Sequence, residues 1–314
     1  NSAGGQNVAI GRNALEKSTI NNLVAVGYKA LSENTTGESN LAIGHTALCS
    51  NTTGRCNLAV GNYALKQNIG GNNNVAVGRT SLGSNTTGGA NTALGYNSLR
   101  ANTVGGNNVA VGLNSLRFNT TGNNNTSLGH NALYTNTTGR CNTAVGASAL
   151  QSNTTGLSNT AVGQDSLRFN TIGYRNTAVG QQALQKNVNG NSNIAIGHLA
   201  LCSNTDTNNV GIGRLALRNK TSGNNNLAIG SNAGACLTSG ASNVFLGTFN
   251  GTGFETQSCN IFISDGAGNV RMFVTGSNGN VGIGTTAPTS NLHVYSTGNG
   301  VIQAERASGA LVFM

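Results

Sequence analysis

The sequence predicts an all-β protein, a parallel β-solenoid (β-roll) of about 15 coils of 17 residues with a C-terminal β-rich cap. The composition points this way: of 314 residues 46 are Gly and 52 are Asn, which leaves few large apolar side chains for a globular core. Gly, Asn and Thr are poor helix formers. No apolar run reaches 18 residues, which excludes a transmembrane helix. A strict repeat and an alternating pattern inside it are the other two observations.

The repeat is set by a glycine in the phrase Asn-x-Ala-Val-Gly-x-x-Ala-Leu. Fifteen such anchors give twelve intervals of 17 residues and two of 16. A fixed period of this kind indicates one supersecondary unit, repeated in the same environment. The anchors are Gly11, Gly27, Gly44, Gly61, Gly78, Gly95, Gly112, Gly129, Gly146, Gly163, Gly180, Gly197, Gly213, Gly230 and Gly247.

Each repeat contains an alternating segment that ends at the anchor. In the repeat around Gly78, Asn74 comes four positions before the anchor, and the bulky Val75 and Val77 flank the small Ala76. Alternation of this kind indicates a strand with one bulky and one small face. Because equivalent residues stack on each other from coil to coil, the asparagines are expected to form an amide ladder.

The rest of the repeat predicts a corner, a second short strand and a turn. Ala or Ser and then Leu follow the anchor by three and four positions, and a turn such as 85–88 (Asn-Thr-Thr-Gly) comes after them. Asn opens such a turn through its own backbone, and Gly is expected to supply a positive φ. Coils stacked at about 4.8 Å give a rod of roughly 70 Å.

The thin core of each coil favours oligomerisation. One Leu, one or two β-branched residues and one or two Ala per coil bury little surface, and small cores are commonly rescued by association. The Ala and Gly face permits close backbone approach, so we expect rolls packed on that face, most simply as a homotrimer. The alternative is a monomeric solenoid whose small face packs across its own coil.

A change in composition near residue 241 divides the chain into a repeat rod, 1–247, and a C-terminal cap, 248–314. Six of the eight Phe lie at or after Phe245, and the Asn-Thr-Thr-Gly turns end. Two strands around a Gly/Asn turn predict a β-hairpin over 260–274. Further strands are expected at 280–286 and 291–295, and a Gly-rich link leads to 301–314. Such a cap would protect the open end of a solenoid.

The repeat resembles two related kinds of fibrous protein. Phrases such as 40–44 (Asn-Leu-Ala-Ile-Gly) are similar to the β-roll heads of trimeric autotransporter adhesins, whose period is usually shorter than 17. The run 280–288 (Asn-Val-Gly-Ile-Gly-Thr-Thr-Ala-Pro), followed by Leu292-His293-Val294, is similar to bacteriophage and viral tail fibres near their C-terminal end. In that family the segment commonly precedes a chaperone that trimerises the fibre and cleaves itself off; no such domain follows here before Met314.

Catalytic and metal chemistry are not expected. Three of the four His, namely His45, His130 and His198, directly follow anchors that are five and four coils apart, and only eight residues are Asp or Glu. Roughly 24 and 19 Å therefore separate these imidazoles within one chain. Glycine phrases such as 276–284 lack the following helix and the Lys-Ser/Thr of a nucleotide loop. We expect no enzyme activity, no metal and no cofactor.

The net charge of +9 comes from scattered Lys and Arg, whereas a nucleic-acid-binding domain would cluster them. One partial column, five positions after the anchor, forms a candidate site for an anionic glycan or lipopolysaccharide when its neighbouring aromatics are included. The alternative is a solvated face that keeps the rod soluble. The candidate residues are Lys66, Arg100, Arg117, Phe118, Arg168, Phe169 and Arg218.

Six Cys occur without a Cys-x-x-Cys pair, which disfavours zinc. Cys49 and Cys56 flank the turn 51–54 and can bridge it, and Cys236 and Cys259 occupy successive coils and can pair likewise. Cys141 and Cys202 have no evident partner. Dispersed, even cysteines suit an extracellular setting, and free thiols are the alternative.

Together these observations predict a structural fibre or adhesion protein: a trimeric, tail-fibre-like rod, extracellular or on a virion surface, that presents a face to a host glycan or protein receptor. The alternative is a bacterial adhesin head or an extracellular filament subunit. Its expected partners are copies of itself and a surface receptor, with no nucleic acid and no membrane insertion.

Overall fold

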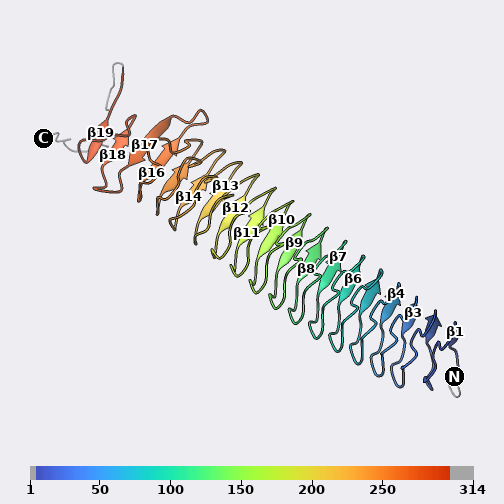
Figure 1. Cartoon of the computed structure of the whole chain (residues 1–314). Coiled ribbons are helices and arrows are strands. Elements are labelled where there is room, and N and C mark those ends of the chain that lie inside the picture. Colours follow the sequence, from blue (N-terminus) through green and yellow to red (C-terminus); the bar gives the residue numbers. More distant parts are fainter. Residues whose placement is uncertain (1–4, 298–314) are drawn as a thin grey trace, which may run out of the picture.

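The computed structural model describes residues 5–297 and confirms the all-β parallel solenoid. Nineteen strands form one sheet that runs the length of a straight rod, with the N-terminal coil at one end and the C-terminal strands at the other (Figure 1). The described residues contain no helix, and thus none with the length and apolar character needed to span a bilayer.

One three-residue strand per coil builds the regular part of the sheet. The strands are β1 (Val8–Ile10), β2 (Val24–Val26), β3 (Leu41–Ile43), β4 (Leu58–Val60), β5 (Val75–Val77), β6 (Thr92–Leu94), β7 (Val109–Val111), β8 (Thr126–Leu128), β9 (Thr143–Val145), β10 (Thr160–Val162), β11 (Thr177–Val179), β12 (Ile194–Ile196), β13 (Val210–Ile212), β14 (Leu227–Ile229) and β15 (Val244–Leu246). Each pairs in parallel and in register with the next, so that Ala59 of β4 faces Ala76 of β5. The 17-residue period therefore becomes a one-coil step of the sheet.

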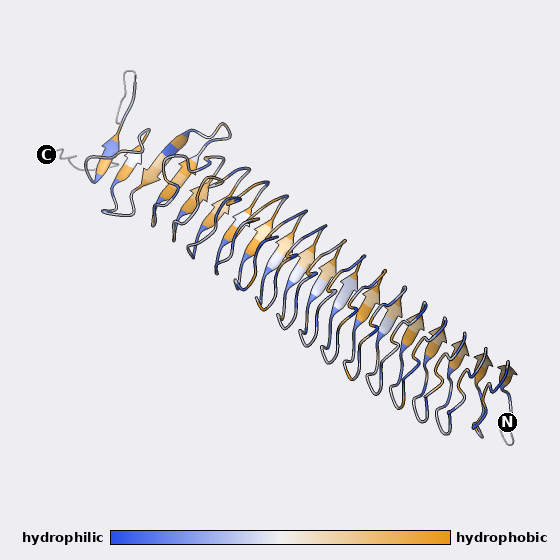
Figure 2. Ribbon diagram, viewed as in Figure 1, coloured by the Kyte–Doolittle hydropathy of each residue, from blue (hydrophilic) through white to orange (hydrophobic). Residues whose placement is uncertain are grey.

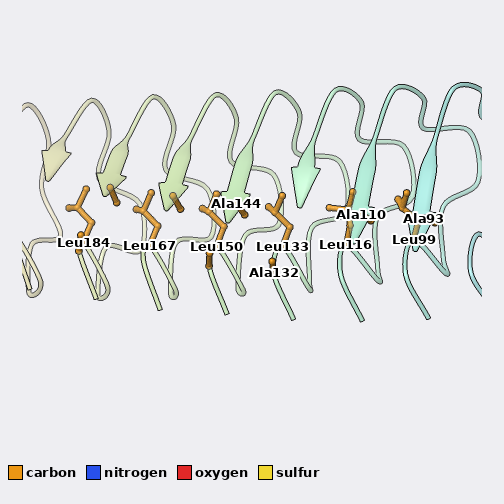
Figure 3. Packing of buried hydrophobic residues seen from close by; sticks show 14 of the residues in the cluster. Ala93, Leu99, Ala110, Leu116, Ala132, Leu133, Ala144, Leu150, Leu167 and Leu184 are labelled. Atoms are coloured by element: carbon orange, nitrogen blue, oxygen red, sulfur yellow. The ribbon is translucent and has the colours of Figure 1, made fainter. Parts of the chain in front are cut away.

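The small face of each strand points into the coil, and the bulky face points outward. Ala76 is fully buried, whereas Val75 is half-buried and Val77 is 36% exposed. The buried alanines pack against a row of leucines from the opposite segment of the coil, of which Leu99, Leu116 and Leu133 are examples (Figure 3). The small face thus packs across its own coil. It is not available to other chains, so the expectation that rolls pack together on it is wrong.

Within residues 5–247, the coils do not contain the second short strand that was expected. The leucine four positions after the anchor has a left-handed backbone, for example φ 49° at Leu65 and at Leu99. In this conformation the Leu65 N–H points towards the next coil, where it donates to the Ser81 carbonyl at 3.0 Å. A left-handed residue costs roughly 1–2 kcal/mol. Full burial of a leucine side chain returns about 1.5–3 kcal/mol, so the strained turn is tolerated in each coil that carries the leucine.

Two asparagine ladders run inside the rod. The predicted one, four positions before the anchor, is confirmed: Asn74 Nδ2 donates to Asn57 Oδ1 at 3.1 Å, and the Asn74 N–H donates to the same oxygen at 3.0 Å. The turn asparagines form a second ladder, in which Asn68 Nδ2 donates to Asn51 Oδ1 at 2.7 Å and to the Gly71 carbonyl at 3.0 Å. Buried amides in both ladders are satisfied by the neighbouring coil, so each coil fixes the register of the next.

Most turn glycines are needed for space and not, as expected, for a positive φ; Gly223, with φ 95°, is an exception. Gly54 has no positive φ, but a Cβ there would lie 2.4 Å from Asn51 Oδ1 and 2.5 Å from the Gly71 carbonyl oxygen. The second ladder therefore excludes every side chain at this position.

The parallel stack passes through residue 247 before it changes direction. β16 (Ile261–Ser264) still pairs in parallel with β15, and then β17 (Val270–Val274) and β18 (Val281–Ile283) pair antiparallel. β19 (Leu292–Val294) pairs in parallel with β18. The expected hairpin and both later strands are confirmed, and the segment 301–314 lies outside the described residues.

A cluster of phenylalanines fills the end of the rod where the coil pattern stops. The Phe262 ring centroid lies 4.8 Å from those of Phe245 and Phe273, and 4.9 Å from that of Phe254. Phe245 and Phe262 occupy the strand positions that Ala fills in most of the other coils. Large rings thus replace the Ala–Leu packing and close the core against β17.

Candidate functional site

The predicted basic column lies on the corner of the coil opposite the strand. Each of its members directly follows a leucine whose side chain fills the core, so the basic side chain points outward. Lys66, Arg100 and Arg218 are exposed, and Arg117 and Arg168 are half-buried. The column consists of Lys66, Arg100, Arg117, Arg168 and Arg218.

A hollow of about 200 Å³ brings two of these cations together. Lys66 and Arg100 belong to coils two steps apart, and Gly83 holds the equivalent position in the coil between them. The absence of a side chain at Gly83 opens the hollow, and Tyr63 forms its aromatic side, with the Lys66 ammonium 5.4 Å from the ring centroid. None of the described residues that line it is a carboxylate. The site has the charge and the ring that bind an anionic sugar.

Two further basic residues of the column are engaged within the chain. The Arg117 guanidinium lies 5.1 Å from the Phe118 ring centroid, and its Nη1 donates to the Tyr134 hydroxyl at 3.2 Å. Arg168 pairs with Asp165 at 3.2 Å and stacks on Phe169 at 5.2 Å. These two arginines brace neighbouring coils, so the predicted seven-residue stripe does not form one binding surface.

A stack of rings beside the hollow was not predicted from the sequence. The rings of Tyr28 and His45 stack at 5.1 Å, and His45 meets the edge of Tyr63 at 5.3 Å. Lys29 adds a cation 5.6 Å from the Tyr28 centroid. These residues follow successive anchors by one or two positions. Their shared position in the repeat is the sequence signal that would have revealed the stack. The rings extend the aromatic side of the hollow over three coils.

The described residues form neither a metal-binding cluster nor a disulfide. In residues 5–297, no three His, Cys, Asp or Glu side chains come close enough together to hold a metal ion. All six cysteines are free thiols, so neither Cys49–Cys56 nor Cys236–Cys259 forms a disulfide in this structure. The Cys49 thiol donates instead to the Lys66 carbonyl of the next coil at 3.5 Å. Burial raises the pKa of the Cys202 thiol, which disfavours its reactive thiolate.

The comparisons with known proteins give no relative for this chain. No family model matches it, no curated protein matches it, and no solved structure matches it.

Proposed function

We propose that this chain is the rod of a self-associating fibre, most simply a trimer, that presents a binding surface away from its base. The observation that carries this proposal is the outer face of the sheet, formed by the outward side chains of β1–β15. This outer face carries Val, Ile, Leu and Thr along the whole rod. In Figure 2 the strands towards both ends of the rod are mostly orange, and several strands in the middle, where Thr occurs, are paler. Exposed apolar surface of that extent is typical of protein–protein contact.

The outer face also fits a copy of the same chain better than it fits an unrelated protein. Its side chains repeat at about 4.8 Å per coil, and a second roll presents the same period. Ile194 and Ile196 of β12 are 39% and 40% exposed. Contact between such faces buries the side chains that a single roll leaves in water, and it replaces the Ala and Gly face as the proposed interface.

The resemblance to tail fibres and adhesin heads supports an extracellular or virion location. A bacterial adhesin head or an extracellular filament subunit remains the alternative, because both use the same rod. A membrane anchor with a coiled-coil stalk in the gene product would favour the adhesin, and a virion-attachment region would favour the tail fibre.

The mass in solution tests the proposal. Light scattering on the purified chain at micromolar concentration should give three times the mass of one chain. A clean monomer over the same concentration range would contradict self-association and with it the fibre assignment.

The hollow between Lys66 and Arg100 supports a second role, the binding of an anionic glycan on a host surface. Replacing both cations, Lys66→Ser with Arg100→Ser, should weaken binding to a sulfated oligosaccharide at least tenfold in calorimetry. Arg218→Ser removes an exposed cation from the same column outside the hollow and should leave binding unchanged. Equal losses in the two variants would show that net charge, and not the hollow, attracts the glycan.

A further inference from the structure

The turn-asparagine ladder is interrupted at one coil by a buried lysine. Lys220 occupies the ladder position after Asn204 and is fully buried. Its ammonium takes over the contacts of an asparagine amide: Nζ lies 3.3 Å from Asn204 Oδ1 and 3.0 Å from the Ser222 carbonyl, and it bonds to the Gly223 carbonyl. A primary amine is thus held against a side-chain amide inside the rod.

Burial favours the neutral form of this amine, which is its nucleophilic form. Burial lowers the pKa of Lys220 to about 8, against a smaller opposing effect of Asp206. Roughly a tenth of the side chain is then neutral at pH 7, compared with less than a thousandth of an ordinary lysine. Desolvation of this kind is a recognised way to activate a lysine for attack on a carbonyl carbon.

The amide that faces Lys220 is polarised and oriented. Asn204 is fully buried, its Nδ2 donates to the Asp206 carbonyl at 2.9 Å, and its Oδ1 accepts from Asn209 Nδ2 at 3.2 Å. Asn209 is therefore placed to stabilise negative charge that develops on Oδ1. Both reacting groups are fixed, which removes most of the entropic cost of bringing them together.

A carboxylate completes the group. Asp206 Oδ2 accepts from the Gly223 N–H at 2.6 Å, and the carbonyl of the same Gly223 accepts from Lys220 Nζ. The Asp206 carboxylate is thus connected to the amine through Gly223, and its charge acts on the Lys220 ammonium, so it is the group that can take up the proton lost by the amine.

We propose that Lys220 and Asn204 react to form an intramolecular isopeptide bond between two successive coils. Lys220 Nζ attacks Asn204 Cγ, and the oxyanion on Oδ1 is held by Asn209. Asp206 accepts the proton lost by Nζ and passes it to Asn204 Nδ2. The Cγ–Nδ2 bond then breaks and ammonia leaves. One amide and one amine become one new amide and one ammonia, so no oxidant or cofactor is needed.

The proposed bond would join coils where the asparagine ladder is interrupted. The coil between Gly197 and Gly213 is one residue short, and its Asn204 donates to the Asp206 carbonyl and not to the ladder asparagine of the preceding coil. Asn187 Oδ1 is therefore buried without a hydrogen-bond partner. After Lys220 the same position holds Leu237, so the ladder ends. A covalent link here would secure the rod against axial pulling at the step where its hydrogen-bonded ladder stops.

Mass spectrometry of the whole purified chain tests the proposal. The wild-type chain should be lighter than its sequence by one ammonia, and a tryptic digest should contain a branched peptide that joins Lys220 to Asn204 and resists cleavage after Lys220. Succinimide formation at an Asn-Gly step also releases ammonia, but it gives no branched peptide, so a deficit without the branch overturns the proposal.

Two variants separate the chemistry from the fold. Lys220→Asn restores the ladder amide and cannot form the bond, so it should fold and show no branched peptide. Asp206→Asn keeps the shape of the side chain but removes the proton carrier, and it should slow formation of the branched peptide at least tenfold. A wild-type chain of full sequence mass, with Lys220 open to trypsin after unfolding, would overturn the proposal.

Discussion

At the scale of single residues, the anchor glycine is the position where we expect substitution to be tolerated least. Gly61 has φ +136°, and a Cβ there would lie 2.6 Å from the carbonyl oxygen of Gly78 in the next coil. Strain of this kind costs about 1–3 kcal/mol before any steric clash is added. Gly61→Ala should therefore lower the free energy of unfolding by about 2 kcal/mol or more, measured from urea denaturation followed by circular dichroism.

Gly70 provides the matched control for that substitution. It has no positive φ, and the nearest atom to its Cβ would be the Thr53 hydroxyl at 3.3 Å. Gly70→Ala should change stability by less than about 0.5 kcal/mol. If the two variants unfolded at the same urea concentration, the tight approach of successive anchors would not explain the glycine repeat.

At the scale of elements, the β16–β17 hairpin is held by one carboxylate in its turn. Asp265 accepts from Asn269 through Nδ2 at 3.1 Å and N–H at 2.9 Å, from Arg271 Nε at 3.0 Å and from the Ala267 N–H at 2.9 Å. These contacts, with Asn269 first, hold the pKa of Asp265 well below its usual range. The stabilisation is therefore complete above the unfolded pKa of about 3.9 and is lost as the pH falls towards the folded value.

This loss of stability at low pH predicts how a variant of Asp265 behaves in acid. At pH 7, Asp265→Asn should melt at a lower temperature than the wild type, because the amide cannot accept all four bonds as a carboxylate does. At pH 2 the difference should shrink, because this carboxyl is then protonated in the unfolded wild-type chain and the folded chain loses most of its advantage. Thermal unfolding followed by circular dichroism measures both values. Glu38→Gln, on an exposed loop of the rod, should match the wild type at both pH values, and a constant deficit for Asp265→Asn would contradict the assigned role.

At the scale of the whole molecule, the proposed interface lies on the outer face of the sheet. Replacing Ile194 and Ile196 with Lys puts like charges opposite each other in any symmetric contact between outer faces, which costs several kcal/mol. The double variant should fall apart to monomers at concentrations where the wild type is a trimer, as measured by light scattering.

The control pair uses apolar side chains in turns. Ile172 and Val188 are 55% and 44% exposed and belong to the turn side of the coil. Lys at both positions should leave the mass unchanged. Dissociation caused by the turn pair, with a stable oligomer in the Ile194 and Ile196 variant, would move the interface from the sheet to the turns.

The aromatic cap shows which features of the fold can be predicted from local sequence patterns and which cannot. The strands of the hairpin and the later strands follow from alternation and turn residues, both of which are local. The packing of Phe262 against Phe245 and Phe273 brings together residues from three strands. The sequence shows only that phenylalanines increase towards the C-terminus.

The site shows the same limit. The column of Lys66 and Arg100 follows from the 17-residue period, because equivalent positions must stack. The hollow between them depends on the missing side chain at Gly83. That Arg117 and Arg168 are engaged by Tyr134 and Asp165 depends on side-chain conformations, which the period does not specify.

The sequence by itself determined the solenoid, its coil length, the strand in each coil and one asparagine ladder, because a strict period forces each residue to stack on its equivalent. Only the tertiary structure decided which face of the strand is inside. Alternation places Ala76 on one face of the strand and Val75 and Val77 on the other, but it does not show which face is buried. The leucine side chains fill the inside of the coil, so the small Ala76 lies against them and the larger Val75 and Val77 are left on the outside.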